Sequence, residues 1–130
     1  MKKMLLTYNF NQERLSKIKR SAIPLKISVR NVEKSEYSQL LGTLAGMKEM
    51  PSSASENNAI SFDDEMLVMC GFDRNDLDTL LRAMNKNGVG RIPLKAILTP
   101  TNILWNSIQL HDAVKADHEE MSQRHSSFSD

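Results

Sequence analysis

The chain has 130 residues, 40% of them hydrophobic and 25% charged, a composition typical of a soluble globular domain that can bury one core. No apolar run approaches the roughly 20 residues that a membrane-spanning helix needs, and the first residues lack the apolar region of a signal peptide. One cysteine excludes an internal disulfide, and the three histidines are scattered, so we expect no metal and no cofactor. A cytoplasmic protein without a membrane partner is predicted.

The net charge is only +1, but the charges are unevenly distributed. Residues 1–34 contain nine Lys/Arg and two Glu, a net charge of +7, whereas residues 35–130 contain eight Lys/Arg and fourteen Asp/Glu, a net charge of −6. Such asymmetry can indicate a nucleic-acid-binding surface or an acidic partner. Basic residues at helical spacing, such as Arg14 and Lys17, more often form the solvated face of a helix, and no aromatic residues alternate with them to stack on bases. Nucleic-acid binding is therefore an unfavoured alternative.

The tetrapeptide Ile-Pro-Leu-Lys occurs twice, at residues 23–26 and 92–95. Each copy follows a similar stretch, in which an apolar run leads to Phe, then Asn or Asp, and then a helical pattern of Leu and Ile. This recurrence predicts an internal duplication within a single domain. The predicted boundaries are one domain over 1–118, repeats at 4–47 and 66–118, a linker at 48–65 and a flexible tail at 119–130.

The first repeat opens with a short apolar run at residues 5–8, which predicts a strand. Asn11 follows, and Asn is among the preferred N-cap residues of helices. With Asn11 as the N-cap, Phe10 and Leu15 occupy the two positions of a hydrophobic staple. We therefore expect a strand followed directly by a helix.

A second strand is expected at residues 25–29, after Pro24. Proline cannot donate to a sheet ladder, so this strand is expected at an edge of the sheet. Residues 35–47 place Tyr and Leu side chains at helical spacing, which predicts a further helix before the linker.

The second repeat is expected to have the same order of elements. Residues 66–70 are apolar at every position, which is typical of a central strand covered on both faces. Asp73 is the predicted N-cap of a helix that ends at Gly88. A strand at 94–98 again follows a proline, and Thr99 before a proline predicts the start of a final helix.

Together the elements predict an α/β fold made of a duplicated β-α-β-α unit. With strands two and four at the edges and right-handed crossovers, the expected sheet is parallel, in the order 2-1-3-4, with helices on both faces. The alternative is an α+β ferredoxin-like antiparallel sheet, which has the same edge strands. The long helical passage between strands two and three disfavours that alternative.

The second repeat resembles a bacterial domain family of unknown function, domain of unknown function 3783. The resemblance rests on Cys-Gly-Phe-Asp at residues 70–73, Arg-Ile-Pro-Leu-Lys-Ala at 91–96, Thr-Pro-Thr-Asn at 99–102 and Trp105. It spans residues 66–105 and implies a bacterial source. It implies no activity, because none is assigned to the family.

Two groups of residues are candidates for ligand binding. Thr99, Thr101 and Asn102 lie at the expected N-terminus of the final helix, with Lys95 upstream, and free N–H groups there could bind a small anion. These residues also suit a helix cap, which is their more common role.

The second group consists of Tyr8, Asn9, Cys70 and Gly71, at the carboxyl ends of the two central strands. In a parallel sheet this is the topological switch point, where ligands usually bind. Cys70 could also be the nucleophile of a thiol-dependent enzyme or sensor, but a buried structural role is more common for cysteine.

The sequence favours a non-catalytic binding or regulatory module, whose partner would be a small anion or another protein. An enzyme or sensor that uses Cys70 is one alternative, and binding of nucleic acid by the basic first repeat is another.

Overall fold

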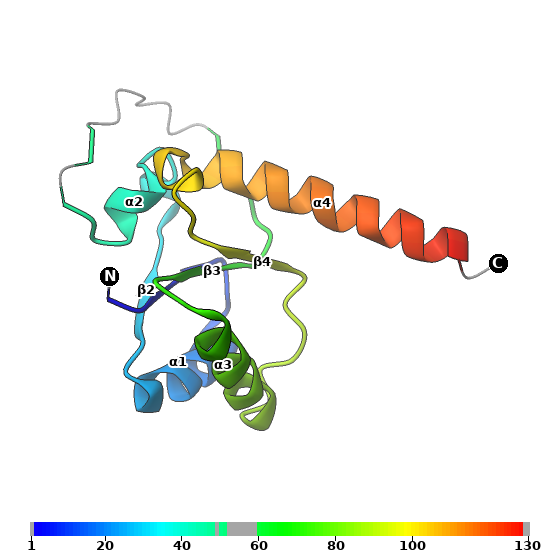
Figure 1. Ribbon diagram of the computed structural model, residues 1–130, viewed down its shortest axis with the longest axis horizontal. Helices are drawn as coiled ribbons and strands as arrows, with labels where there is room; N and C mark the ends of the chain where they lie inside the picture. The colour runs from blue at the N-terminus through cyan, green and yellow to red at the C-terminus, as the bar shows by residue number, and fades with distance from the viewer. Residues whose placement is uncertain (1, 49, 52–59, 129–130) are drawn as a thin grey trace.

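The computed structural model describes residues 2–48, 50–51 and 60–128, with side chains described as far as residue 121 (Figure 1). Parts of the predicted linker at 48–65 and of the predicted tail at 119–130 lie outside these residues. The elements are β1 (Met4–Tyr8), α1 (Gln12–Ala22), the 3-10 turn η1 (Ile23–Leu25), β2 (Ser28–Asn31), the 3-10 turn η2 (Lys34–Glu36), α2 (Leu41–Leu44), β3 (Met66–Cys70), α3 (Arg74–Lys86), β4 (Leu94–Ile97), the 3-10 turn η3 (Asn102–Leu104) and α4 (Ser107–Phe128).

The four strands form one sheet in the predicted order β2-β1-β3-β4. The pairs β1–β2 and β3–β4 are parallel, but the central pair is antiparallel, with Met4 opposite Cys70 and Tyr8 opposite Met66. The prediction of an all-parallel sheet is therefore wrong, and so is the all-antiparallel alternative. The sheet is mixed.

The antiparallel central pair brings both crossover helices to the same face. In each β-α-β unit the chain passes from a central strand through a helix to the edge strand beside it. If all strands were parallel, right-handed crossovers would place α1 and α3 on opposite faces of the sheet. With β3 reversed and β4 still at the outer edge, a right-handed crossover places α3 on the same face as α1. In agreement, Ile18 and Ala22 of α1 share a buried cluster with Leu80 and Met84 of α3.

The other face is covered by η2, α2 and the start of α4, so helices lie on both faces of the sheet, as predicted (Figure 1). Tyr37, which follows η2, packs together with Leu44 of α2 and Leu110 of α4 against Leu6 and Val68 of the central strands. Beyond its first turns α4 runs past the sheet, and its residues become exposed. None of the described helices is both long and apolar enough to cross a membrane.

The predicted N-caps of α1 and α3 are confirmed. The Asn11 side chain accepts a hydrogen bond from the Arg14 N–H (2.8 Å), and the Asp73 side chain accepts one from the Asp76 N–H (2.8 Å). The Asp76 carboxylate also accepts from the Asp73 N–H (3.0 Å), which completes a capping box. After α3 the chain turns at Gly88, whose φ of 73° lies in the left-handed region that favours glycine.

The two Ile-Pro-Leu-Lys segments adopt different conformations. Residues 23–26 form η1 and a left-handed Lys26, whereas residues 92–95 run directly into β4. β2 begins only at Ser28, which pairs with the first residue of β1, just as Leu94 pairs with the first residue of β3. The tetrapeptides are therefore not structurally equivalent. Both repeats have the strand-helix-strand order, and their origin in a duplication stays a prediction.

The predicted single helix over residues 35–47 is wrong. Only η2 and the four-residue α2 form in this stretch. Leu40 instead bridges to Asn106, and the Leu41 N–H donates to the Trp105 carbonyl (2.8 Å). Backbone groups that a continuous helix would have paired internally thus bind the loop that precedes α4.

Candidate functional site

The turn at residues 99–104 is closed by its own polar side chains. The Thr99 N–H donates to the Asn102 side-chain oxygen (2.8 Å), the Asn102 N–H donates to the Thr99 hydroxyl (3.1 Å), and the Asn102 amide donates to the Ile97 carbonyl (3.0 Å). Thr101 is exposed beside them. Thr99 and Asn102, two of the residues predicted to bind an anion, therefore bond to each other and hold the three-residue η3 in place.

The prediction that Thr99 starts the final helix is wrong, because α4 begins at Ser107. Asn106 and Gln109 exchange backbone-to-side-chain hydrogen bonds of 2.8 and 2.9 Å at its start, the reciprocal pattern of a capping box. Lys95 does not join the turn, since its ammonium donates to the Ile92 carbonyl (2.7 Å).

The residues predicted for a switch-point crevice are separated by the antiparallel central pair. Tyr8 and Asn9 end β1 beside the first residue of β3, whereas Cys70 and Gly71 end β3 beside the first residue of β1. The two pairs thus lie at opposite ends of these strands. A single crevice lined by all four residues does not form.

Cys70 is fully buried, with 0% exposure, in the cluster on the α2 and α4 face of the sheet. Burial raises the pKa of its thiol to about 12, because a thiolate would lose its hydration there. The thiol is therefore neutral at neutral pH. This burial is consistent with the structural role that is more common for cysteine, and the arrangement does not favour a nucleophile.

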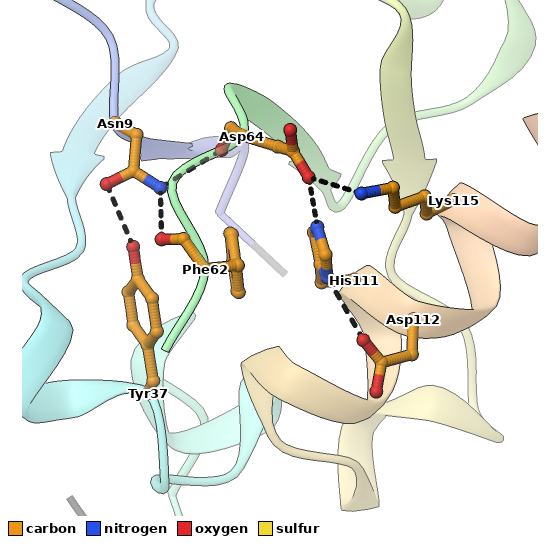
Figure 2. Close-up of polar contacts among 7 residues, drawn as sticks. All are labelled: Asn9, Tyr37, Phe62, Asp64, His111, Asp112 and Lys115. Atoms are coloured by element: carbon orange, nitrogen blue, oxygen red, sulfur yellow. Dashed lines mark hydrogen bonds and ion pairs between the residues drawn. The ribbon is translucent and has the colours of Figure 1, made fainter. Parts of the chain in front are cut away.

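A polar network forms at the other end of the central strands, around Asn9 (Figure 2). Asn9 has a left-handed backbone (φ 62°), which Asn tolerates better than most residues. Its side-chain amide donates to the carbonyls of Phe62 (2.9 Å) and Asp64 (3.0 Å), and its side-chain oxygen accepts from the Tyr37 hydroxyl (3.2 Å). Asn9 thereby fixes the segment that leads into β3.

His111 of α4 connects that segment to the helix. Its ring is 6% exposed and stacks on Phe62, with centroids 4.0 Å apart and planes within 8°. Its Nε2 lies 2.8 Å from Asp64 and its Nδ1 lies 3.1 Å from Asp112 (Figure 2). Both ring nitrogens therefore contact carboxylate oxygens, one in the loop before β3 and one in α4.

Lys115, one helical turn beyond His111, donates to the same Asp64 oxygen at 3.3 Å. The pKa of Asp64 is held below its ordinary value, chiefly by the hydrogen bond from His111 and further by Lys115. Asp64 is therefore an ionised carboxylate held by the side chains of His111 and Lys115 and, through its backbone carbonyl, by Asn9.

An aromatic stack supports this network from the core. Tyr37 stacks on Phe62 (4.6 Å, 21°), and the Tyr8 ring lies 5.5 Å from Tyr37 and 5.6 Å from Phe62. The Tyr8 hydroxyl shares a 2.8 Å hydrogen bond with Ser107, and burial raises the pKa of Tyr8, so this hydroxyl stays protonated. The packed rings limit the movement of Phe62 and His111.

A pocket of about 280 Å³ opens beside Asp64, and we call it the acidic pocket. Its lining residues are Asp64, Glu65, Pro93, Leu94, Lys115, His118 and Glu119. Three of them are carboxylates and one is a lysine. Glu65 pairs with Arg14 outside the pocket, whereas Glu119 forms no ion pair with a described side chain. Pro93 and Leu94 supply an apolar wall.

Sequence reasoning did not bring Asp64 and His111 together. They are 47 positions apart, one in a loop and the other in a helix, and no local spacing marks such a pair. The Asn-x-x-Gln pattern at residues 106–109 was the available signal for the true start of α4. Within the described residues, no group of three His, Cys, Asp or Glu side chains could hold a metal ion.

Comparison with known families confirms the resemblance found in the second repeat. Residues 65–121 match the model of a domain of unknown function (DUF3783). No solved structure matches the chain. The matched residues run from the loop before β3 into α4 and include every lining residue of the acidic pocket except Asp64. Over these residues the chain is similar to a family whose function is unknown.

Proposed function

We propose that the protein is a non-catalytic binding module that takes a small organic amine in the acidic pocket. The observation that carries this proposal is the lining itself, in which three carboxylates face one lysine beside an apolar wall. An ammonium group would be attracted to Glu119 and to the neighbouring carboxylates. A short hydrocarbon stem would lie against Pro93 and Leu94.

The fixed position of Asp64 supports the proposal. Its backbone carbonyl accepts from Asn9, and its carboxylate accepts from His111 and Lys115. A binding group that is already ordered loses little conformational entropy when a ligand arrives, which favours affinity.

The surroundings of the reactive side chains support a binding role rather than catalysis. The Cys70 thiol is buried in the core and neutral. Both ring nitrogens of His111 are bound to carboxylates, and the ring is 6% exposed, so neither nitrogen is placed to take a proton from a ligand. A regulatory role would follow if the ligand altered the exposed part of α4.

The test is a titration with n-butylamine, followed by amide chemical shifts, with butyrate as a control of similar size and opposite charge. We expect saturable shifts at residues 64–65, 93–94 and 115–119 for the amine alone. Replacing Glu119 by Gln should weaken binding about fivefold, because one exposed charge contact contributes about 1 kcal/mol.

The matched control is Asp117→Asn, which removes one charge from the same helix outside the pocket lining. It should leave amine binding unchanged. Equal shifts for butyrate and n-butylamine, or equal losses for the two variants, would show that the pocket does not select an organic cation.

A further inference from the structure

A second pocket, of about 120 Å³, lies between the last turns of α3 and the loop that leads into β4. We call it the basic pocket. Asn85, Arg91 and Lys95 supply its polar side chains, and Met84 and Ile92 belong to the buried cluster beneath it. It thus lies on the helix-α3 face of the sheet, whereas Leu94 of the acidic pocket belongs to the cluster on the other face.

The lining of this pocket contains two cations and no carboxylate. The Arg91 guanidinium forms no ion pair with a described residue, and Lys95 donates to a neutral acceptor, the Ile92 carbonyl, at 2.7 Å. The pKa of Lys95 is lowered, first by burial and then by the positive charge of Arg91. The second effect shows that the nearest charge acting on Lys95 is positive.

The end of α3 does not supply a counter-charge. Unpaired carbonyls at a helix C-terminus attract cations, but the carbonyls of the two pocket-lining residues in the last turn of α3 are already bonded. The Met84 carbonyl accepts from the Val89 N–H (3.0 Å), and the Asn85 carbonyl accepts from the Gly88 N–H (3.1 Å). Arg91 and Lys95 therefore remain without a counter-charge at the pocket.

We propose that the basic pocket binds a tetrahedral oxyanion such as phosphate. The planar guanidinium of Arg91 can donate two parallel hydrogen bonds to such an anion, Lys95 adds a second positive charge, and the Asn85 amide adds a neutral donor. The volume corresponds to roughly four water molecules, enough for phosphate but too small for a nucleoside. Lys95 thus remains an anion ligand, as predicted from the sequence. Its partners in this proposal are Arg91 and Asn85, and not the residues of the turn at 99–102.

The experiment is a titration of the full chain with inorganic phosphate at constant ionic strength, balanced with chloride. We expect saturable amide shifts at residues 85, 90–92 and 95, and a rise in the pKa of Lys95 when phosphate is bound. Sulfate should behave like phosphate, and acetate should bind more weakly because it lacks the tetrahedral set of oxygens.

Arg91→Gln should weaken phosphate binding at least about fivefold, the loss expected for one charged contact. The control is Arg74→Gln, which removes a cation from the opposite end of α3. Glu119→Gln, the variant that tests the acidic pocket, should leave phosphate binding unchanged, so the two sites are tested separately. Shifts no larger than those caused by chloride, or an equal effect of the two arginine variants, would overturn the proposal.

Discussion

Asn9 and Lys26 share a left-handed backbone (φ 62° in both) for different reasons. Asn9 uses this conformation to aim its side chain at Phe62, Asp64 and Tyr37. Lys26 only ends η1, where its N–H donates to the Ile23 carbonyl (2.9 Å), and its side chain is exposed. The backbone geometry is the same, but only Asn9 contributes polar contacts.

This difference predicts opposite effects of glycine at the two positions. Lys26→Gly should raise the free energy of unfolding by about 0.5 kcal/mol, because glycine adopts φ > 0 without steric cost. Asn9→Gly should lower it by about 2 kcal/mol, because the bonded carbonyls and the Tyr37 hydroxyl lose their partner. Urea unfolding of both variants measures the two values. A similar change in both would show that the Asn9 side chain contributes nothing.

Cys70 gives a second test at this scale. Its thiol is buried and has a pKa of about 12, and thiolate is the reactive form. We expect a thiol reagent at neutral pH to modify the native protein far more slowly than the protein unfolded in urea. Modification at the same rate in both conditions would contradict the burial of this side chain.

At the scale of elements, Asp64 joins the loop before β3 to α4, and this contact depends on pH. The folded-state pKa of Asp64 is lowered from its ordinary value of 3.8, so its contribution to stability is fully present above that value. The contribution is lost as the pH falls through the lower, folded-state pKa. Acid conditions should therefore weaken the link between this loop and the helix.

We expect Asp64→Asn to lower the free energy of unfolding at pH 7 by about 1 kcal/mol, a modest value because the carboxylate is 45% exposed. The difference from the unaltered chain should shrink as the pH is lowered below 3.8. Asp63→Asn is the control, since its ion pair with Lys34 is at the surface, and it should change stability by less than about 0.5 kcal/mol. Equal effects at all pH values would exclude this role for the Asp64 carboxylate.

Local signals in the sequence predicted helix boundaries best where a single capping residue determines the start of the helix. Asn11 and Asp73 were found as N-caps because a cap depends on the backbone beside it. The same reasoning failed at Thr99, because a Thr-Pro pair can close a 3-10 turn as well as start a helix. The Asn-x-x-Gln pattern at residues 106–109 is the local signal that marks the observed start of α4.

Contacts between distant elements were not predictable in the same way. A run that is apolar at every position, such as Met66–Cys70, fits the centre of a sheet in either direction, so the direction of β3 stayed open. The site around Asp64 and His111 depends on that direction, because it brings the start of β3 to the end of β1 at Asn9. The acidic pocket could not be predicted before the direction of β3 was known.

At the scale of the whole molecule, the antiparallel central pair relates the two β-α-β units by an approximate two-fold rotation. The register is symmetric about Leu6 and Val68, with Met4 opposite Cys70 and Tyr8 opposite Met66. Nuclear Overhauser contacts between these opposed residues should be observed in solution. Contacts of Met4 with Met66 in their place would indicate a parallel pair and would contradict the contact between Asn9 and Asp64.

The symmetry does not extend to the surface beside β4, where the two proposed pockets have opposite charge. Residues 90–95 separate them, with Ile92 facing the α3 side and Leu94 facing the α4 side. Carboxylates dominate the acidic pocket and cations the basic one. We therefore expect the molecule to bind a cation and an anion independently on the two faces of one sheet edge.

The most direct test of the central claim is a crystal structure of the protein grown with n-butylamine. We predict that the ammonium group lies within hydrogen-bonding distance of a carboxylate in the acidic pocket, Glu119 or Asp64, with the alkyl stem against Pro93 and Leu94. An empty acidic pocket at an amine concentration that saturates the amide shifts, or an amine bound elsewhere on the molecule, would contradict the proposed function.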